Sequence, residues 1–308
     1  MPVFSHKVSI GPPGFAEWRP DGARSVAVLM SGGVDSSVAA MLLRDAGWNA
    51  AGFTMKLPAS GCPDLEYGQA VAVAGRLGIP HYFVDAGAFF EASVVGYFRE
   101  LYASGRTPSP CVACNPTVKF GAVRDAVEAV FGSVHFASGH YAEIIEDEGR
   151  FRLARAVDTA RDQSYFLYRV RPERLAGLLF PLGRRRKADV RETARRAALP
   201  VADRQDSMEL CFAGGRNYRE LLRDVPSSPG DIIDVSGRIV GRHKGIVNYT
   251  IGQRRGLRVA AGKPVYVVAI DPRRNTVTLG SRADVLHTHI AAEDVVVHVP
   301  EEYVRGRE

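Results

Sequence analysis

The sequence predicts an α/β protein with a doubly wound parallel sheet, followed by a small β domain. Between residues 25 and 140, short apolar runs alternate with helical patterns. That alternation is typical of a parallel sheet with helices on both faces. From Asp231 onwards the pattern changes to short β segments separated by Gly turns, which indicates a separate β domain.

The expected strands and helices of the sheet follow one another in a regular order. They are strand 25–30, helix Ser37–Ala46, strand Ala50–Met55, helix Pro63–Leu77, strand His81–Val84, helix Ala88–Ser104, helix Lys119–Phe131 and strand Val134–Ala137. In such a sheet, ligands bind at the carboxyl ends of the strands. Four segments are therefore expected to line one cleft: Ser31–Ser37, Thr54–Lys56, 107–116 and Gly139-His140.

The rest of the chain is assigned from composition and turn residues. Residues 1–24 are rich in Pro and Gly and are expected to be a flexible or loosely packed extension. A hairpin is expected at 141–155, a helix at 187–198, and β segments at Asp231–Val235, Arg238–Val240, Val265–Ile270, Thr276–Gly280 and Ala291–Val299. The predicted domains are the extension (1–24), a main domain (25–225), a central β domain (226–286) and the start of a C-terminal β region (287–308).

Composition narrows the function classes. The chain has 308 residues and a formal net charge of +6, and its arginines are concentrated between Arg150 and Arg196. Such a region favours a polyanionic partner such as RNA, and a solvated arginine-rich face is the alternative. No apolar run approaches the roughly 20 residues of a membrane span, and the first 24 residues lack an apolar signal core, so a cytoplasmic location is expected. Four cysteines are too few for a disulfide scaffold.

The segment Ser31-Gly32-Gly33-Val34-Asp35-Ser36-Ser37 lies between an expected strand and an expected helix. Its two glycines can adopt positive φ and let the backbone close around a ligand. The N–H groups and dipole at the start of the next helix favour an anion. The loop therefore predicts a phosphate site, and the absence of a Gly-Lys-Ser/Thr ending separates it from a Walker A loop. An ordinary Gly-rich turn with a serine N-cap is the alternative.

The cysteines suggest a second site. Cys111 and Cys114 form a Cys-x-x-Cys pair and are expected to flank a turn in the proline-containing segment Thr107–Asn115, and Cys211 lies in a later segment. Three kinds of chemistry remain open: persulfide transfer through a thiolate of lowered pKa, a zinc site and an iron–sulfur site. A zinc ribbon would need a second pair, which the sequence lacks. Cys111, Cys114 and Cys211 could supply three ligands to a cluster, one fewer than the usual four. For Cys62, a small buried side chain without chemical function is as good an explanation as a functional thiol.

Taken together, these motifs resemble the tRNA-specific 2-thiouridylase family MnmA, which has a PP-loop ATP pyrophosphatase fold of the adenine nucleotide alpha hydrolase-like type. The matching segments run in order along the chain: Ser31–Ser37, Thr107–Asn115, Lys119–Gly121, Gly139–Tyr141, Asp162–Leu167, Phe180–Gly183, Asp206–Phe212, His243–Gly245 and Tyr249–Arg254. Asp-Gln-Ser-Tyr-Phe-Leu and Tyr-Thr-Ile-Gly-Gln-Arg are the most specific of these segments.

The resemblance implies ATP-dependent adenylation of the C2 oxygen of the wobble uridine in tRNA. Sulfur transfer from a cysteine persulfide then gives 2-thiouridine, AMP and pyrophosphate. It also implies Mg²⁺ and a persulfide-donating sulfur carrier or cysteine desulfurase. By motif, Cys114 is the expected nucleophile, Cys211 the persulfide carrier, and Asp35 a ligand of Mg²⁺–pyrophosphate. The expected nucleotide-binding residues are Leu29, Met30, Ser31, Gly32, Gly33, Val34, Asp35, Ser36, Met55 and Gly139. The expected tRNA-binding residues are Ser109, Pro110, Cys111, His140, Arg161, Asp162 and Gln163.

Three features depart from the family pattern. Met208 stands where glutamine is common, Ser109 stands where asparagine is usual, and the chain ends at Glu308 before the usual C-terminal β-barrel. Two rival functions remain. One is another PP-loop sulfurtransferase, which could depend on an iron–sulfur cluster. The other is a tRNA-binding or sulfur-relay protein without turnover.

Overall fold

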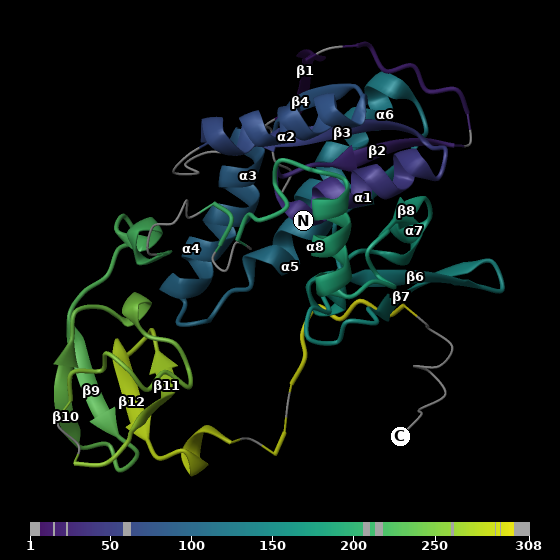
Figure 1. Cartoon of the computed structure of the whole chain (residues 1–308). Coiled ribbons are helices and arrows are strands. Elements are labelled where there is room, and N and C mark those ends of the chain that lie inside the picture. Colours follow the sequence, from purple (N-terminus) through teal and green to yellow (C-terminus); the bar gives the residue numbers. More distant parts are fainter. Residues whose placement is uncertain are drawn as a thin grey trace. The chain divides into compact units, whose positions relative to one another are not determined.

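Figure 1 shows the computed structural model, which describes residues 7–14, 16–22, 24–57, 63–205, 210–212, 218–259, 262–286, 288–289 and 291–298. The described residues divide into two compact units. The first unit contains the described parts of Met1–Ser93, Cys111–Gly215 and Val296–Glu308, and the second those of Val94–Pro110 and Arg216–Val295. Within these residues, no helix is long and apolar enough to cross a membrane.

A six-stranded sheet forms the centre of the first unit, in the order β1-β4-β3-β2-β5-β8. Strand β1 runs antiparallel to β4, and the other neighbouring strands are parallel. The strands are β1 (Ser9–Pro13), β2 (Ser25–Leu29), β3 (Asn49–Lys56), β4 (His81–Asp85), β5 (His135–Ser138) and β8 (Leu178–Leu179). The predicted doubly wound α/β fold is thereby confirmed.

The strand order reverses at β2. The chain passes from β2 to β3 and β4 on one side, whereas β5 pairs with the opposite side of β2. Ligands of open α/β sheets bind outside the carboxyl ends of the strands at such a reversal. Ser31–Ser37 follows β2 and Gly139-His140 follows β5. Both loops therefore lie at the position where this fold binds ligands.

Both faces of the sheet are buried (Figure 1). On one face, apolar residues of helices α1 (Val34–Asp45), α2 (Pro63–Leu77) and α8 (Lys187–Arg196) share a core with Val26 and Val28 of β2. On the other face, rings of β3, β4, helix α6 (Arg124–Phe131) and the N-terminal segment form an aromatic cluster. Strand β2 is buried throughout, as expected for a central parallel strand.

The described part of residues 1–24 contains a strand and a buried tryptophan, where the sequence predicts a flexible or loosely packed extension. Ser9–Pro13 forms edge strand β1, in which Ile10 lies opposite Val84. Trp18 is 3% exposed and packs against Phe53 and Phe131. An edge strand tolerates proline because one of its sides needs no ladder hydrogen bonds. The prolines that suggested a loose segment are therefore compatible with a strand here.

The chain between β4 and β5 is broken into short helical pieces instead of the two long helices expected. They are α3 (Gly87–Phe90), the π-helical stretch η1 (Glu91–Val95), α4 (Gly96–Ala103), α5 (Pro110–Cys114), the π-helical stretch η2 (Asn115–Val123) and α6. The Cys111–Cys114 pair lies on helix α5 and not in the expected turn. Pro110 opens this helix, and proline is favoured in a first helical turn because its missing N–H would have no partner there.

A hairpin follows β5, as predicted. Strands β6 (Ala142–Asp147) and β7 (Arg150–Arg155) pair antiparallel, and Glu148 and Gly149 form their turn with φ of 50° and 75°. The 3₁₀ turn η3 (Ser164–Phe166), helix α7 (Pro172–Leu175), β8 and α8 complete the unit.

The second unit contains a four-stranded sheet in the order β10-β9-β12-β11, which confirms the predicted small β domain. Its strands are β9 (Gly230–Asp234), β10 (Ile239–His243), β11 (Tyr266–Asp271) and β12 (Thr276–Gly280), with 3₁₀ turns η4 (Tyr218–Leu222), η5 (Ile246–Asn248) and η6 (Ala283–Val285). Ile232, Val267 and Val277 form its core. Residues 291–298 adopt no strand, contrary to the expectation for Ala291–Val299.

A buried histidine in the main sheet makes stability depend on pH. His81 is fully buried, its Nε2 lies 2.8 Å from Thr54 Oγ1, and burial lowers its pKa to about 4. The unfolded chain protonates His81 near its ordinary pKa of 6.5, so the unfolded state binds more protons between these two values and stability falls as pH falls.

We expect the free energy of unfolding to drop by about 2 kcal/mol from this group between about pH 7.5 and about pH 5. Urea unfolding of wild type and His81→Gln at both pH values measures the contribution. An equal drop in both proteins would contradict this assignment.

Candidate functional site

The Ser31–Ser37 loop has an open, uncapped helix start. Gly32 adopts φ of 70°, whereas Gly33 is extended with φ of −93° and is the N-cap of α1. No side chain caps the first N–H groups of α1, so these groups and the helix dipole are available to an anion. Ser31 is exposed at the mouth of the loop. Ser31–Ser37 can therefore hold a phosphate group and forms an anion loop.

The other two serines of the loop fix its own shape. Ser36 Oγ accepts a hydrogen bond from Ser31 N at 3.2 Å and donates to Gly33 O at 3.1 Å. Ser37 Oγ donates to the same carbonyl at 2.8 Å. Both hydroxyls are buried. Of the predicted loop residues, Ser36 therefore holds the backbone of the anion site in place.

Gly139, after β5, lies directly against this loop. A Cβ on Gly139 would be 2.7 Å from both Asp35 C and Ser36 N. Real Cβ atoms do not approach backbone so closely, so only glycine fits here without moving the loop. Leu29 and Met30 are buried at the end of β2, Val34 is buried in α1, and Met55 is partly buried near the end of β3.

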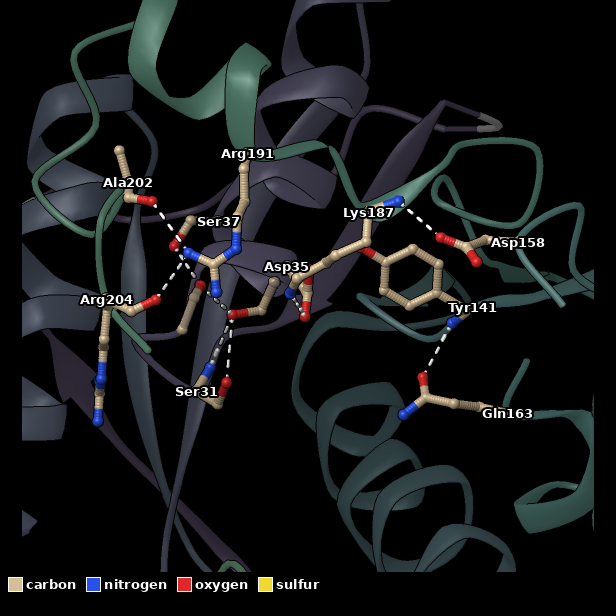
Figure 2. A network of polar contacts seen from close by, with 12 residues as sticks. Ser31, Asp35, Ser37, Tyr141, Asp158, Gln163, Lys187, Arg191, Ala202 and Arg204 are labelled. Atoms are coloured by element: carbon tan, nitrogen blue, oxygen red, sulfur yellow. Dashed lines mark hydrogen bonds and ion pairs between the residues drawn. The ribbon is translucent and has the colours of Figure 1, made fainter. Parts of the chain in front are cut away.

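Asp35 is the centre of a polar network (Figure 2). Lys187 Nζ donates to Asp35 Oδ1 and Oδ2, both at 2.7 Å, and Tyr141 Oη donates to Asp35 Oδ1 at 2.8 Å. Lys187 opens helix α8 and is 8% exposed. Neither Lys187 nor Tyr141 is among the site residues expected from the sequence.

Two arginines fix the segment that follows α8. Arg204 Nη1 donates to Gly32 O at 2.9 Å and also binds Gln69 Oε1. Arg191 Nη1 donates to Ala202 O at 3.3 Å and to Arg204 O at 2.9 Å (Figure 2). Arg204 therefore ties the region just before 206–209, which lies outside the described residues, to the anion loop.

The predicted tRNA-binding segment 161–163 is bound to the same network. Gln163 Oε1 accepts from Tyr141 N at 2.9 Å, and Gln163 N donates to Tyr141 O at 2.7 Å. The Asp162 carboxylate accepts from Ala156 N and from Ser164 Oγ, and these bonds hold its pKa below its ordinary value although burial opposes them. Arg161 is exposed. Asp162 and Gln163 thus shape the turn that Arg161 precedes.

His140 is held as a neutral ring. Its Nδ1 lies 2.7 Å from Ser138 Oγ, and the ring packs at 5.8 Å from Phe120 and 5.7 Å from Phe180. Burial, and to a smaller extent the charge of Lys119, lowers its pKa well below the ordinary value. At neutral pH His140 can donate or accept a hydrogen bond but carries no charge.

The three described cysteines differ in accessibility. Cys114 is 6% exposed, whereas Cys111 and Cys211 are exposed. The pKa of Cys114 is raised to about 12, mainly by burial. The charge of Lys119 acts in the opposite direction, and charge repulsion from Cys211 and Cys111 adds small increases. Both other thiols therefore lie within electrostatic range of Cys114. This structure holds Cys114 as a protonated thiol.

The thiols do not form a ready-made metal site. In the part of the chain that the structure describes, no three His, Cys, Asp or Glu side chains are arranged to hold a metal ion. Cys111, Cys114 and Cys211, the possible cluster ligands, differ in exposure: Cys114 is buried in helix α5, whereas the other two are exposed. Cys62 lies outside the described residues. Ser109 and Pro110 immediately precede Cys111, and Pro110 is buried.

A difference in thiol reactivity follows from this burial. With a pKa of about 12, only about one Cys114 in ten thousand is a thiolate near pH 8. We expect iodoacetamide to alkylate Cys114 at least about a hundredfold more slowly than Cys111. Peptide mass spectrometry after timed quenching measures both rates. In guanidinium the two rates should converge, and equal rates in the native protein would contradict the burial of Cys114.

The comparisons with known proteins cover both units. Residues 24–215 match a family model described as the tRNA methyl transferase HUP domain, and residues 219–281 match one described as the tRNA methyl transferase PRC-barrel domain. Named relatives carry a different activity in their names. The tRNA-specific 2-thiouridylase MnmA of Xanthobacter autotrophicus is 45% identical over 88% of this chain and 72% of its own length.

Other relatives give the same result. The proteins of the same name from Syntrophomonas wolfei and Carboxydothermus hydrogenoformans are 48% and 41% identical, over 83% and 89% of this chain and 75% and 79% of their own lengths. A solved structure of NMN synthetase from Francisella tularensis is a more distant match, with a TM-score of 0.42 and 16% identity over 65% of this chain and 72% of that one.

Proposed function

The chain belongs to the tRNA-specific 2-thiouridylase family MnmA, and from this we propose how its own residues divide the reaction between an anion loop and a group of thiols. The enzyme is an ATP-dependent tRNA-uridine 2-sulfurtransferase, which converts the wobble uridine of tRNA to 2-thiouridine with release of AMP and pyrophosphate. The observation that best supports the division is the position of the uncapped start of α1 and of Cys114 within one compact unit.

The first step is adenylation. The C2 oxygen of the uracil attacks the α-phosphate of ATP, the bond to the β-phosphate breaks, and pyrophosphate leaves. The uncapped N–H groups of α1 and exposed Ser31 would bind the pyrophosphate portion. Mg²⁺, when bound, would neutralise developing charge on the phosphates, and Asp35 is the loop carboxylate suited to it. Gly139 keeps the loop in its conformation.

The second step replaces the activated oxygen with sulfur. The terminal sulfur of a Cys211 persulfide attacks C2, and AMP leaves with the C2 oxygen. The Cys114 thiolate then attacks Cys211 Sγ, the sulfur–sulfur bond to the base breaks, and 2-thiouridine is released together with a Cys114–Cys211 disulfide. An external thiol reductant restores both thiols. Cys114 must leave its buried position or lose its proton for this attack, and Lys119 is the nearby charge that favours the thiolate.

The sulfur of the persulfide would come from a sulfur carrier or a cysteine desulfurase, and we place the reaction in the cytoplasm. An iron–sulfur route is the second candidate, supported only by the presence of Cys111 beside Cys114 and Cys211. Anaerobic purification followed by iron and sulfide assays distinguishes the two routes. Iron-free protein that forms product excludes the cluster, whereas activity that tracks iron content excludes the simple persulfide route.

The decisive experiment is nucleoside mass analysis of unmodified tRNA after incubation with the enzyme, ATP, Mg²⁺ and a persulfide donor. We expect 2-thiouridine that depends on ATP and on the donor. A tRNA-binding or sulfur-relay protein would bind tRNA but show neither 2-thiouridine nor tRNA-stimulated ATP–pyrophosphate exchange. That result would reject the proposed division of the reaction.

The aromatic residues after Gln163 support contact with unstacked bases of the anticodon loop. Tyr165 is 66% exposed and Tyr168 is 42% exposed, with ring centroids 6.1 Å apart. The turn that carries Tyr165 is held next to η2, the helical stretch that follows Cys114, because Asn115 Nδ2 donates to Phe166 O at 2.8 Å. Exposed aromatic rings stack on bases in single-stranded RNA.

We expect Tyr165→Ala to weaken tRNA binding by about tenfold, since stacking contributes about 1–3 kcal/mol per base. Tyr165→Phe, which keeps the ring, should bind tRNA nearly as wild type does. Filter binding or fluorescence anisotropy with an anticodon stem–loop measures both variants. Equal loss in both would point to the hydroxyl group and reject stacking.

A further inference from the structure

Lys187 is a buried cation at the anion loop. It is 8% exposed, and lysine is rarely buried unless its charge is paired. Its Nζ lies 2.7 Å from both carboxylate oxygens of Asp35, although the two residues are 152 positions apart in the chain. In sequence it is the last residue of an Arg-Arg-Arg-Lys run. The fold thus brings one member of a basic run to the start of α1.

Three further contacts hold Lys187 and Asp35 in position (Figure 2). Lys187 N donates to Asp158 Oδ2 at 2.8 Å, which holds the start of α8. Tyr141 Oη donates to Asp35 Oδ1 at 2.8 Å and orients the carboxylate. The Tyr141 ring centroid is 5.9 Å from Lys187 Nζ, within the range of a cation–π contact. The charge therefore has a defined place beside the loop.

The charges in the loop explain why a cation is needed there. Asp35 lies in the first turn of α1, where the helix dipole and the uncapped N–H groups attract an anion. A phosphate that binds this helix start would be repelled by the Asp35 carboxylate. Lys187 neutralises that carboxylate from within hydrogen-bond distance. An anion bound beside Asp35 at the start of α1 would be attracted by the same ammonium group.

We propose that Lys187 binds the pyrophosphate portion of ATP from its position on Asp35, and so stabilises pyrophosphate as it leaves. The inference rests on the proposed use of this loop for ATP and adds a residue to it. Lys187 contributes positive charge to the leaving group without transferring a proton. The competing explanation is that the ion pair has only a structural role. Buried pairs can often be replaced by apolar residues without loss of stability, so burial alone does not decide between the two.

The test measures pyrophosphate binding to the full chain by calorimetry, with and without Mg²⁺ and in the absence of tRNA. Lys187→Met should weaken pyrophosphate binding by about tenfold or more, the range expected for a lost charge-assisted hydrogen bond. AMP binding, which lacks the pyrophosphate portion, should stay within about twofold. Lys187→Arg, which keeps the charge, should recover part of the affinity.

Arg196→Met is the matched control, because Arg196 is an exposed cation on the same helix. It should bind pyrophosphate as wild type does. Because Lys187→Met leaves Asp35 without its cation and can lower stability, the double variant Asp35→Asn with Lys187→Met removes both charges. Thermal melting establishes that each variant is folded. A folded double variant that binds pyrophosphate as wild type does would show that the pair is only structural and would overturn the proposal.

The inference and the proposed function fail in different assays. If Lys187→Met forms 2-thiouridine and binds pyrophosphate like wild type, the role of Lys187 is wrong while the function holds. If Lys187 is needed for pyrophosphate binding but the wild-type chain forms no 2-thiouridine, the proposed function is wrong while the pyrophosphate site holds.

Discussion

Serine in place of Cys211 is expected to abolish thiolation of tRNA while tRNA-stimulated ATP–pyrophosphate exchange continues. The serine hydroxyl cannot carry a sulfane sulfur, and the exposed position of Cys211 means that the change disturbs little packing. In the proposed mechanism, adenylation uses the anion loop and does not need the thiol. Nucleoside mass analysis for 2-thiouridine and an isotope-exchange assay, run on the same preparation, separate the two steps.

Cys111→Ser is the informative comparison, because Cys111 is also exposed and also lies near Cys114. The persulfide route expects Cys111→Ser to retain thiolation, whereas a cluster that uses all three thiols would lose it. Thiolation by Cys211→Ser at the wild-type rate would show that another group carries the sulfur.

Alanine in place of Gly139 should reduce ATP–pyrophosphate exchange by about a hundredfold, because a misplacement of reacting groups by about 1 Å can slow a reaction by that factor. The added Cβ would meet backbone atoms of Asp35 and Ser36 at 2.7 Å, and backbone cannot swing aside as a flexible side chain can. The loop must shift relative to β5. We also expect a loss of stability of about 1–3 kcal/mol from overpacking.

Gly68→Ala provides the control for the Gly139 variant. Gly68 lies in helix α2, and no atom lies within 4 Å of the position of an added Cβ. This change should leave exchange unaltered and slightly raise the melting temperature, since alanine favours a helix. Normal exchange in Gly139→Ala would mean that the loop accommodates the methyl group. The close approach of Gly139 to Asp35 and Ser36 would then not be required for activity.

Much of the fold could be predicted from the sequence because the parallel strands are short apolar runs with clear helical patterns between them. Edge strand β1 could not, since Pro12 and Pro13 give no strand pattern and the strand forms only by pairing with β4. The Cys111–Cys114 helix was missed for a related reason. Prolines near a pair of cysteines suggest a turn, yet Pro110 is also a good first residue of a helix.

The anion loop was predictable because its residues are contiguous, and the rest of its surroundings were not. Lys187 stands in a run of basic residues whose other members, Arg184, Arg185 and Arg186, suggest a solvated face. In the described structure, Lys187 is the member of this run that forms an ion pair with Asp35. This contact becomes visible only in the folded chain. Likewise the sequence marks Cys114 as a nucleophile, and only its burial shows that it is held protonated.

Tyr141 connects the Ser31–Ser37 loop to the segment proposed to bind tRNA. Its hydroxyl group donates to Asp35 in the anion loop. Its backbone forms two hydrogen bonds with Gln163, which belongs to the proposed tRNA-binding segment 161–163. Asp35 and Gln163 therefore bond to different atoms of the same residue. Because binding free energies are linked, any factor by which ATP tightens tRNA binding must also be the factor by which tRNA tightens ATP binding. Under the proposed site assignments, this one residue would connect ATP binding to tRNA binding.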